Sequence, residues 1–213
     1  NPTGAVYSEQ ALAELGRRLE RFGQPVSVIC DEPYKALTFD GVKTPEVPRF
    51  IERTVIANSW SKALAIPGER IGYLAISPRI PDARQLFDAF EFTLRVLGFV
   101  NAPALWQRVV AAVGDKTIDI RPYQEKRDLL CDALERFGYQ LVRPQGAFYV
   151  FPRTPIEDDV AYVRLLQEAG VLTVPGVAFG RSEHIRISLT VARETIEKAL
   201  PSFERVFASA ATS

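Results

Sequence analysis

A helix-then-strand pattern near the start of the chain restricts the fold more than any other feature. Ser8 can cap a helix whose apolar residues recur every three or four positions and whose end is marked by Gly23. The apolar run 26–30 follows and reads as a buried strand, and residues 54–59 and 72–77 read as two more strands. Helices that alternate with strands in this way predict an α/β fold built on a mainly parallel sheet.

The pattern changes after about residue 118. A long helix is predicted over 120–137, with Gly138 as its stop, and short strands then alternate with helices. We therefore divide the chain into residues 1–118 and a smaller α+β domain of residues 119–213. The remaining predicted helices are 82–97, 103–113, 158–169 and 194–207, the last kinked or split at Pro201, and the remaining predicted strands are 140–142, 147–151, 171–174 and 185–190.

Several polar side chains with matched chemistry surround a sharp turn after the second predicted strand. Lys62 carries an amine that can form a Schiff base with an aldehyde. The hydroxyls of Ser59 and Ser61 can donate hydrogen bonds to phosphate oxygens, and the planar fork of Arg70 can bind two such oxygens. This set suits a covalently held aldehyde cofactor that carries a phosphate. Pyridoxal phosphate (PLP) fits that description.

A carboxylate at the end of the first predicted strand strengthens this interpretation. Asp31 directly follows the apolar run 26–30, which puts it at the carboxyl end of a strand, where ligands bind in open α/β sheets. A carboxylate there can keep the pyridine nitrogen of PLP protonated, so that the ring accepts electrons from a carbanion. Tyr34, shortly after it, can reach the neighbouring ring hydroxyl.

Together with Asn-Pro-Thr-Gly at residues 1–4 and Ile-Arg-Ile-Ser at 185–188, these motifs resemble the PLP-dependent class I and II aminotransferases, the fold type I group. The motifs agree in identity, order and spacing along nearly the whole chain. The resemblance implies that residues 1–118 are the C-terminal part of the PLP-binding large domain and that residues 119–213 are the small domain. It also implies amino-group transfer between an α-amino acid and a 2-oxo acid, in a cytoplasmic homodimer.

The resemblance assigns a role toward the cofactor to most of these residues. Lys62 would form the Schiff base and shuttle protons. Asp31 would pair with the pyridine nitrogen, and Tyr34 and Asn1 would hydrogen-bond the phenolic oxygen. The implied phosphate ligands are Ser59, Ser61 and Arg70.

Toward the substrate, the resemblance implies that Arg186 binds the α-carboxylate with help from Asn1, and that Phe148 lies near the substrate entrance. Family members carry a similar length of chain before the Asn-Pro-Thr-Gly motif. That part supplies a backbone phosphate cradle, an aromatic stacked on the ring and groups that cross to the partner subunit. We therefore expect this chain to be the C-terminal half of such an enzyme and to be inactive alone.

Composition limits the other classes of function. Lys plus Arg and Asp plus Glu each number 26, so no excess positive charge indicates a nucleic-acid surface. No apolar run approaches the roughly 20 residues that a membrane helix needs. Cys30 and Cys131 are far apart in sequence, show no metal-ligand spacing and read as reduced cytosolic thiols. The tail 208–213 is expected to fray.

Each candidate residue also has an ordinary structural interpretation. An arbitrary lysine such as Lys62 is usually a solvated surface charge, and an aspartate after a strand, such as Asp31, is often a turn cap. Asp31, Glu32 and Asp40 could suggest a metal site, although no histidine or regular oxygen-ligand spacing supports it, and we predict no metal.

Arg186 could be a paired core arginine. His184 has no partner in sequence and is expected to be structural or exposed, and the glycines of 176–180 indicate a loop near the site.

Three alternative functions stay open on the sequence. A PLP-dependent C–S lyase that performs β-elimination would carry the same motifs. A non-catalytic effector domain of a transcription regulator would bind PLP without turnover. The chain could also be a folded but inactive fragment that supplies packing and dimer contacts.

Overall fold

The computed structural model describes residues 1–211, which form two compact units. The first unit consists of residues Tyr7–Leu37 and Lys43–Ile118. The second consists of Asn1–Val6, Thr38–Val42 and the chain from Asp119 onward. The chain therefore passes between the units several times, and each unit is described by itself below.

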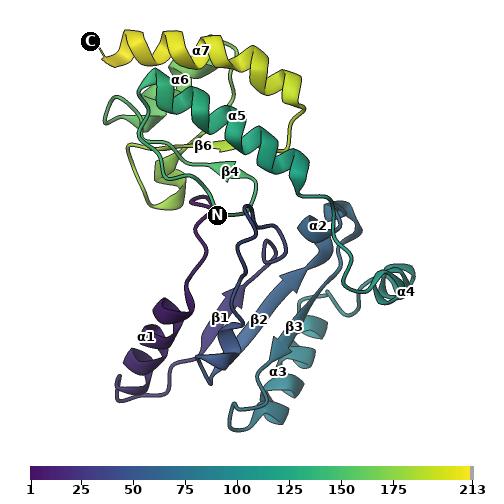
Figure 1. Cartoon of the computed structure of the whole chain (residues 1–213). Coiled ribbons are helices and arrows are strands. Elements are labelled where there is room, and N and C mark those ends of the chain that lie inside the picture. Colours follow the sequence, from purple (N-terminus) through teal and green to yellow (C-terminus); the bar gives the residue numbers. More distant parts are fainter. Residues whose placement is uncertain (212–213) are drawn as a thin grey trace. The chain divides into compact units, whose positions relative to one another are not determined.

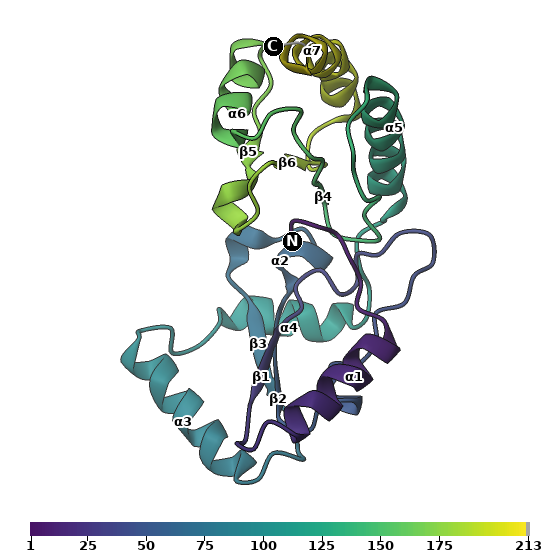
Figure 2. The same cartoon turned by 90° about the vertical axis from the view of Figure 1, so that its left-hand side faces the viewer.

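The first unit holds a three-stranded sheet of order β1-β2-β3 (Figure 1). Helices α1 and α3 lie on either side of this sheet (Figure 2). The predicted α/β class is confirmed, and the predicted helices and strands of this unit are all present. The elements are α1 (Glu9–Glu20), β1 (Val28–Asp31), η1 (Val47–Arg49), β2 (Thr54–Ser59), α2 (Trp60–Ala63), η2 (Pro67–Glu69), β3 (Gly72–Ile76), α3 (Ala83–Val96) and α4 (Ala104–Val113).

Strand direction in this sheet is mixed. β1 and β2 run parallel, with Asp31 opposite Ala57. β3 runs antiparallel to β2, with Gly72 opposite Ser59, because the connection 60–71 turns back through two short helices. The parallel pair places the carboxyl ends of β1 and β2 at one edge, and the antiparallel strand begins at that same edge.

The start of α1 follows from local hydrogen bonding. Ser8 is its N-cap, and its hydroxyl accepts a hydrogen bond from the backbone N–H of Ala11 at 3.1 Å. The apolar face then packs Leu12 against Val47 and Ile51 in a small buried cluster. The predicted start of this helix is confirmed.

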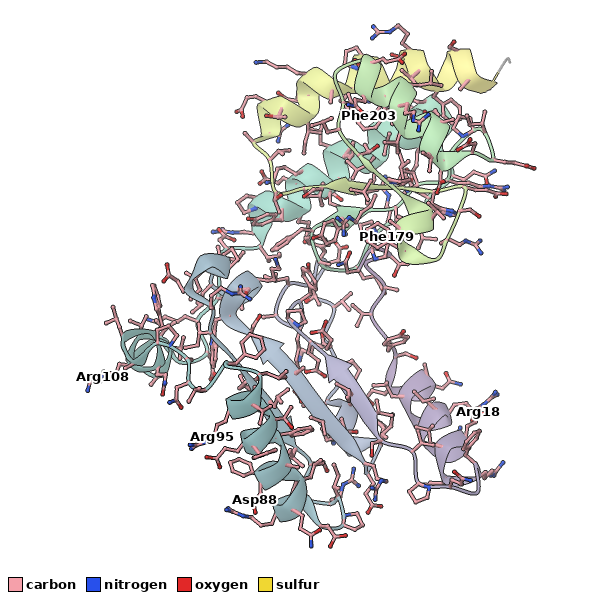
Figure 3. All side chains as sticks on the ribbon, turned by 180° about the vertical axis from the view of Figure 1, so that it is seen from behind. Arg18, Asp88, Arg95, Arg108, Phe179 and Phe203 are labelled. Carbon is pink, nitrogen blue, oxygen red and sulfur yellow. The ribbon has the colours of Figure 1, made fainter. Side chains whose placement is uncertain are left out.

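The second unit packs three long helices over a small antiparallel sheet of order β4-β6-β5 (Figure 1). Its core is apolar and includes Phe203, labelled in Figure 3, which is 2% exposed. The elements are α5 (Arg121–Phe137), β4 (Tyr149–Val150), α6 (Asp159–Glu168), β5 (Val174–Pro175), η3 (Gly176–Phe179), β6 (Ile185–Ser188) and α7 (Arg193–Ala211).

The structure corrects or only partly tests three predictions for this unit. Residues 140–142 form no strand, and Gln140 instead accepts a single backbone hydrogen bond from Arg153. Pro201 lies inside α7 without splitting it. Residues 208–211 of the predicted frayed tail are helical, while residues 212–213 lie outside the described part of the chain.

A buried arginine on α5 holds the segment Thr38–Val42 in the second unit. Arg127 is 4% exposed and donates to both carboxylate oxygens of Asp40, at 2.6 and 3.0 Å. It also donates to the carbonyl of Pro144. The hydrogen bond from Arg127 holds the pKa of the Asp40 carboxyl below its usual value. The carboxylate of Asp40 is therefore ion-paired with Arg127. Among residues 1–211, no three or more His, Cys, Asp or Glu side chains lie close enough together to bind a metal ion.

Replacing Tyr139 by phenylalanine is expected to destabilise the second unit more than the same change at Tyr162. The two buried hydroxyls hydrogen-bond each other, and that of Tyr139 donates to the carbonyl of Phe203 at 3.2 Å. Burial raises the pKa of both hydroxyls, that of Tyr162 to about 12, so both stay protonated. Loss of the Tyr139 hydroxyl removes the acceptor of Tyr162, which costs about 1–3 kcal/mol, whereas the reverse change leaves the bond to Phe203 intact. Urea unfolding of both variants measures the difference; equal losses would contradict this direction of donation.

Candidate active site

The predicted cofactor ligands of the first unit gather around the ends of its parallel strands. Asp31 is the last residue of β1, and Ser59 is the last residue of β2. Because the two strands are parallel and in register, both residues lie at the same edge of the sheet. α2 begins directly after Ser59 and carries Ser61 and Lys62, so these side chains start from that edge as well.

Lys62 is half-buried, and its Nζ lies 6.0 Å from the centre of the Tyr34 ring. No carboxylate pairs with it among residues 1–211. Ser59 occupies the N-cap position of α2, yet its hydroxyl makes no capping hydrogen bond. This edge of the sheet therefore carries the Lys62 amine, which has no counter-ion, and the Ser59 hydroxyl, which is not used to cap a helix.

The turn that carries Arg70 is shaped by close backbone packing. Arg70 has a left-handed backbone with φ of 51°, and its guanidinium donates to the carbonyl of Pro67 at 2.5 Å. At Gly72 a Cβ atom would lie 2.6 Å from the carbonyl oxygen of Asn58 and 3.0 Å from Cβ of Ser59. Only glycine lets β3 start this close to the end of β2.

Replacing Gly72 by alanine is expected to destabilise the chain by about 1–3 kcal/mol, because the backbone of β2 must shift to admit the methyl group. Gly68→Ala is the matched control, since a Cβ there would meet nothing within 4 Å. Thermal and urea unfolding of the two variants give the comparison. Equal stability of the two variants would show that the contact at Gly72 relaxes freely.

A polar network around the buried Glu32, the residue after Asp31, was not anticipated from the sequence. Glu32 is 8% exposed, and its carboxylate accepts from the thiol of Cys30 and lies 3.2 Å from Nζ of Lys35. Lys35 also pairs with Glu46 at 2.6 Å. Burial, together with the hydrogen bond to Glu32, raises the pKa of Cys30 to about 12, so the thiol stays neutral. The network ties the turn that follows Asp31 to the segment before β2.

In the second unit, the structure brings Arg186 and Asn1 together. Arg186 lies on β6 and donates to Oδ1 of Asn1 at 3.2 Å. Its guanidinium carbon lies 4.4 Å from the ring centres of both Tyr149 and Phe179. No carboxylate pairs with Arg186 in the described chain, and its guanidinium contacts two aromatic rings and one amide oxygen.

Gly4 fixes the first residues of the chain within the second unit. Its carbonyl accepts from the backbone N–H groups of Gln145 and Gly146, at 2.9 and 3.1 Å. Its φ is +67°, and a Cβ would lie 2.3 Å from Cβ of Pro144. This close approach needs glycine, and it anchors the segment that begins with Asn1.

Two neighbouring aromatic residues of this unit have different surroundings, and the place of Phe148 near the substrate entrance stays a prediction. Phe148 lies in the core, 5% exposed, and its ring centre is 4.6 Å from that of Tyr123. The next residue, Tyr149, is the one that contacts Arg186. Phe179, from the glycine-bearing loop 176–180, also contacts Arg186, so that loop does lie near the carboxylate-binding candidate.

The donor set of the first unit suits PLP. An unpaired lysine can bind an aldehyde, Ser59, Ser61 and Arg70 can donate to a phosphate, and a carboxylate lies at the end of the neighbouring strand. The second unit offers an unpaired guanidinium suited to a carboxylate. Among the helices of residues 1–211, none combines the length and the apolar character needed to cross a bilayer.

Comparison with known proteins agrees with this chemistry. The family model described as "Aminotransferase class I and II" matches residues 1–203. The chain is 32% identical to the aromatic-amino-acid aminotransferase 2 of Thermococcus litoralis, covering 97% of this chain and 54% of that protein. It is 33% identical to the aspartate/prephenate aminotransferase of Thermus thermophilus, covering 99% of this chain and 55% of that protein.

Solved structures are also similar. An amino transferase from Eubacterium rectale superposes with a TM-score of 0.93 at 38% identity, covering 98% of this chain and 54% of that one. An aspartate aminotransferase from Thermotoga maritima gives a TM-score of 0.82 at 29% identity, covering 96% and 53%. The chain thus spans about half the length of the relatives it matches.

Proposed function

Because this chain belongs to the class I and II aminotransferase family, whose members depend on PLP, we propose that the protein moves an amino group between an α-amino acid and a 2-oxo acid. The observation that carries the proposal is the unpaired Lys62 at the edge where the parallel strands β1 and β2 end. A lysine without a counter-ion, next to hydroxyl donors and a strand-end carboxylate, suits covalent binding of an aldehyde cofactor.

PLP, when bound, supplies an electron sink for the charge that develops at the substrate α-carbon. Lys62 would hold the cofactor covalently through Nζ, and the same amine, once displaced, would accept and return the α-proton. The carboxylate of Asp31 would accept a hydrogen bond from the pyridine nitrogen and favour its protonated form. Tyr34 and Asn1 would donate to the phenolic oxygen.

The remaining residues would bind and orient. Ser59, Ser61 and Arg70 would hold the phosphate through hydroxyl and guanidinium donors. Arg186 would bind the substrate α-carboxylate, assisted by Asn1, and so fix the direction of the α-hydrogen, which is a positioning effect. The absence of a carboxylate partner for Arg186 in the described chain supports this role.

The first experiment is to record the visible absorption of the full-length gene product with PLP, before and after amino acids are added without a 2-oxo acid. Amino-group transfer predicts that some amino acids convert the band of the lysine-bound cofactor into the band of its aminated form. Release of pyruvate and ammonia instead would identify a lyase. A band that no amino acid changes would favour a non-catalytic effector domain. Absence of any band would overturn the assignment of Lys62.

We also propose the domain division at residue 118, with residues 1–118 as part of the PLP-binding large domain and 119–213 as the small domain. In its support, the last passage of the chain between the two compact units falls between Ile118 and Asp119. Residues 1–6 and 38–42 group with the second unit, so the division by sequence and the division by packing differ there.

A homodimer in the cytoplasm is the proposed state of the protein. In support of the dimer, no residue of α3 or α4 is buried, and Phe92, Phe99 and Leu105 are each about 70% exposed. Apolar surface of this kind needs a cover. In support of the cytoplasm, Cys30 and Cys131 are free thiols. Analytical ultracentrifugation tests the dimer, and a purely monomeric protein at micromolar concentration would refute it.

A further inference from the structure

The surroundings of Arg186 are more specific than carboxylate binding alone requires. β6 is the central strand of its sheet, with β4 on one side and β5 on the other. Tyr149 comes from β4, and Phe179 comes from η3, which directly follows β5. The two rings therefore come from segments on either side of β6 in the sheet, and the centre of each lies 4.4 Å from the guanidinium carbon.

The ring of Phe179 is held in place by its own contacts. Phe179, labelled in Figure 3, meets the Phe151 ring edge to face, with centres 6.3 Å apart. The loop that carries it is fixed at Gly176, where a Cβ would lie 2.2 Å from the carbonyl oxygen of Arg181. The buried carboxylate of Asp159 accepts from the N–H of Val177 at 2.8 Å in the same loop. These contacts hold the Phe179 ring in position against the Arg186 guanidinium.

Aromatic rings against a guanidinium leave only its edge for a ligand. Arginine stacks on aromatic faces and donates its hydrogen bonds within its own plane. A planar carboxylate can meet that edge with two coplanar oxygens. A tetrahedral sulfonate or phosphonate directs a third oxygen out of the plane, toward an aromatic face, which is electron-rich and cannot donate a hydrogen bond to it.

We propose that Tyr149 and Phe179 are positioning residues that make the Arg186 site select planar carboxylates over tetrahedral anions. This deepens the proposed function and rests on it, since Arg186 is there the group that binds the substrate carboxylate. In an amino-acid enzyme such a device rejects the sulfonate and phosphonate analogues of amino acids. It also keeps free phosphate from occupying the carboxylate site.

The test uses propionate and ethanesulfonate, which share an ethyl group and differ in the anion. The isotope-labelled chain is titrated with each, and the Nε–H resonance of Arg186 is followed by NMR, assigned through its loss in Arg186→Lys. We expect propionate to bind about tenfold more tightly than ethanesulfonate. In Phe179→Leu, propionate binding should weaken by about threefold to thirtyfold. The ratio of the ethanesulfonate Kd to the propionate Kd should fall toward one. Phe179→Tyr keeps the ring and should keep the ratio.

Tyr149→Leu tests the opposite ring in the same way, and circular dichroism shows whether either leucine variant has unfolded. A ratio that stays near tenfold in both folded variants overturns the proposal, as does equal binding of the two anions by the unaltered chain. The titration uses no cofactor. If Lys62 fails to bind PLP, the proposed function is refuted and the measured anion selectivity is unaffected. Equal binding of the two anions refutes only the proposed selectivity of the Arg186 site.

Discussion

Replacing Lys62 by alanine is expected to abolish turnover, with a fall in rate of at least about 10²–10⁴-fold. The variant loses the amine that attaches the cofactor and the general base that takes the α-proton, and proton transfer alone contributes a factor of that size. The visible band of the lysine-bound cofactor should vanish in the same variant. Steady-state amino transfer and an absorption spectrum of the PLP-loaded full-length gene product give the two measurements.

The substitution of Lys62 should leave folding intact. Its side chain makes no ion pair in the described chain, so no buried charge is orphaned by its loss. Lys116→Ala is the matched control, because Lys116 is an exposed lysine of the same unit and should retain full activity. Turnover by Lys62→Ala at the level of the control would exclude Lys62 as the cofactor lysine.

Replacing Arg186 by leucine should lower kcat/KM by about 30-fold to several thousand-fold. Truncation of one partner of a hydrogen-bonded charge pair costs about 2–5 kcal/mol, and the substrate carboxylate would lose its partner. If the carboxylate is bound equally in the ground state and the transition state, most of the loss appears in KM. Initial rates over a range of amino acid concentrations separate the two parameters.

Arg186→Lys distinguishes charge from geometry at this position. Lysine keeps the positive charge but lacks the planar fork, and its stem cannot stack on Tyr149 and Phe179 as a guanidinium does. We expect an intermediate loss for this variant. Arg164→Gln, an exposed arginine on α6 of the same unit, serves as the control. Wild-type KM values in Arg186→Leu would mean that another cation binds the carboxylate.

The sequence predicted features that depend on neighbouring residues. Ser8 caps α1 through the N–H of Ala11, three residues away, and Gly138 ends α5 in the left-handed conformation. Capping is local, so a short window of sequence contains both partners. The position of Asp31 at a strand end was accessible for the same reason, since the apolar run and the carboxylate are adjacent.

Contacts between segments far apart in the chain could not be predicted from the sequence. Phe148 and Tyr149 are neighbours with aromatic rings, and only the pairing of β4 with β6 shows which one meets Arg186. The assignment of residues 38–42 to the second unit depends on Arg127, which lies on α5 and pairs with Asp40. Neither partner is marked by a local pattern.

The sequence by itself determined the α/β class, most helices and strands, and the residue types of the candidate site, because periodicity, caps and short motifs act over a few residues. Tertiary structure alone decided that β3 runs antiparallel, that Glu32 holds the turn beside Asp31, and that two rings flank Arg186. These features depend on hydrogen bonds and packing between segments far apart in the chain. Such contacts are selected by the burial of the whole unit rather than by any one segment.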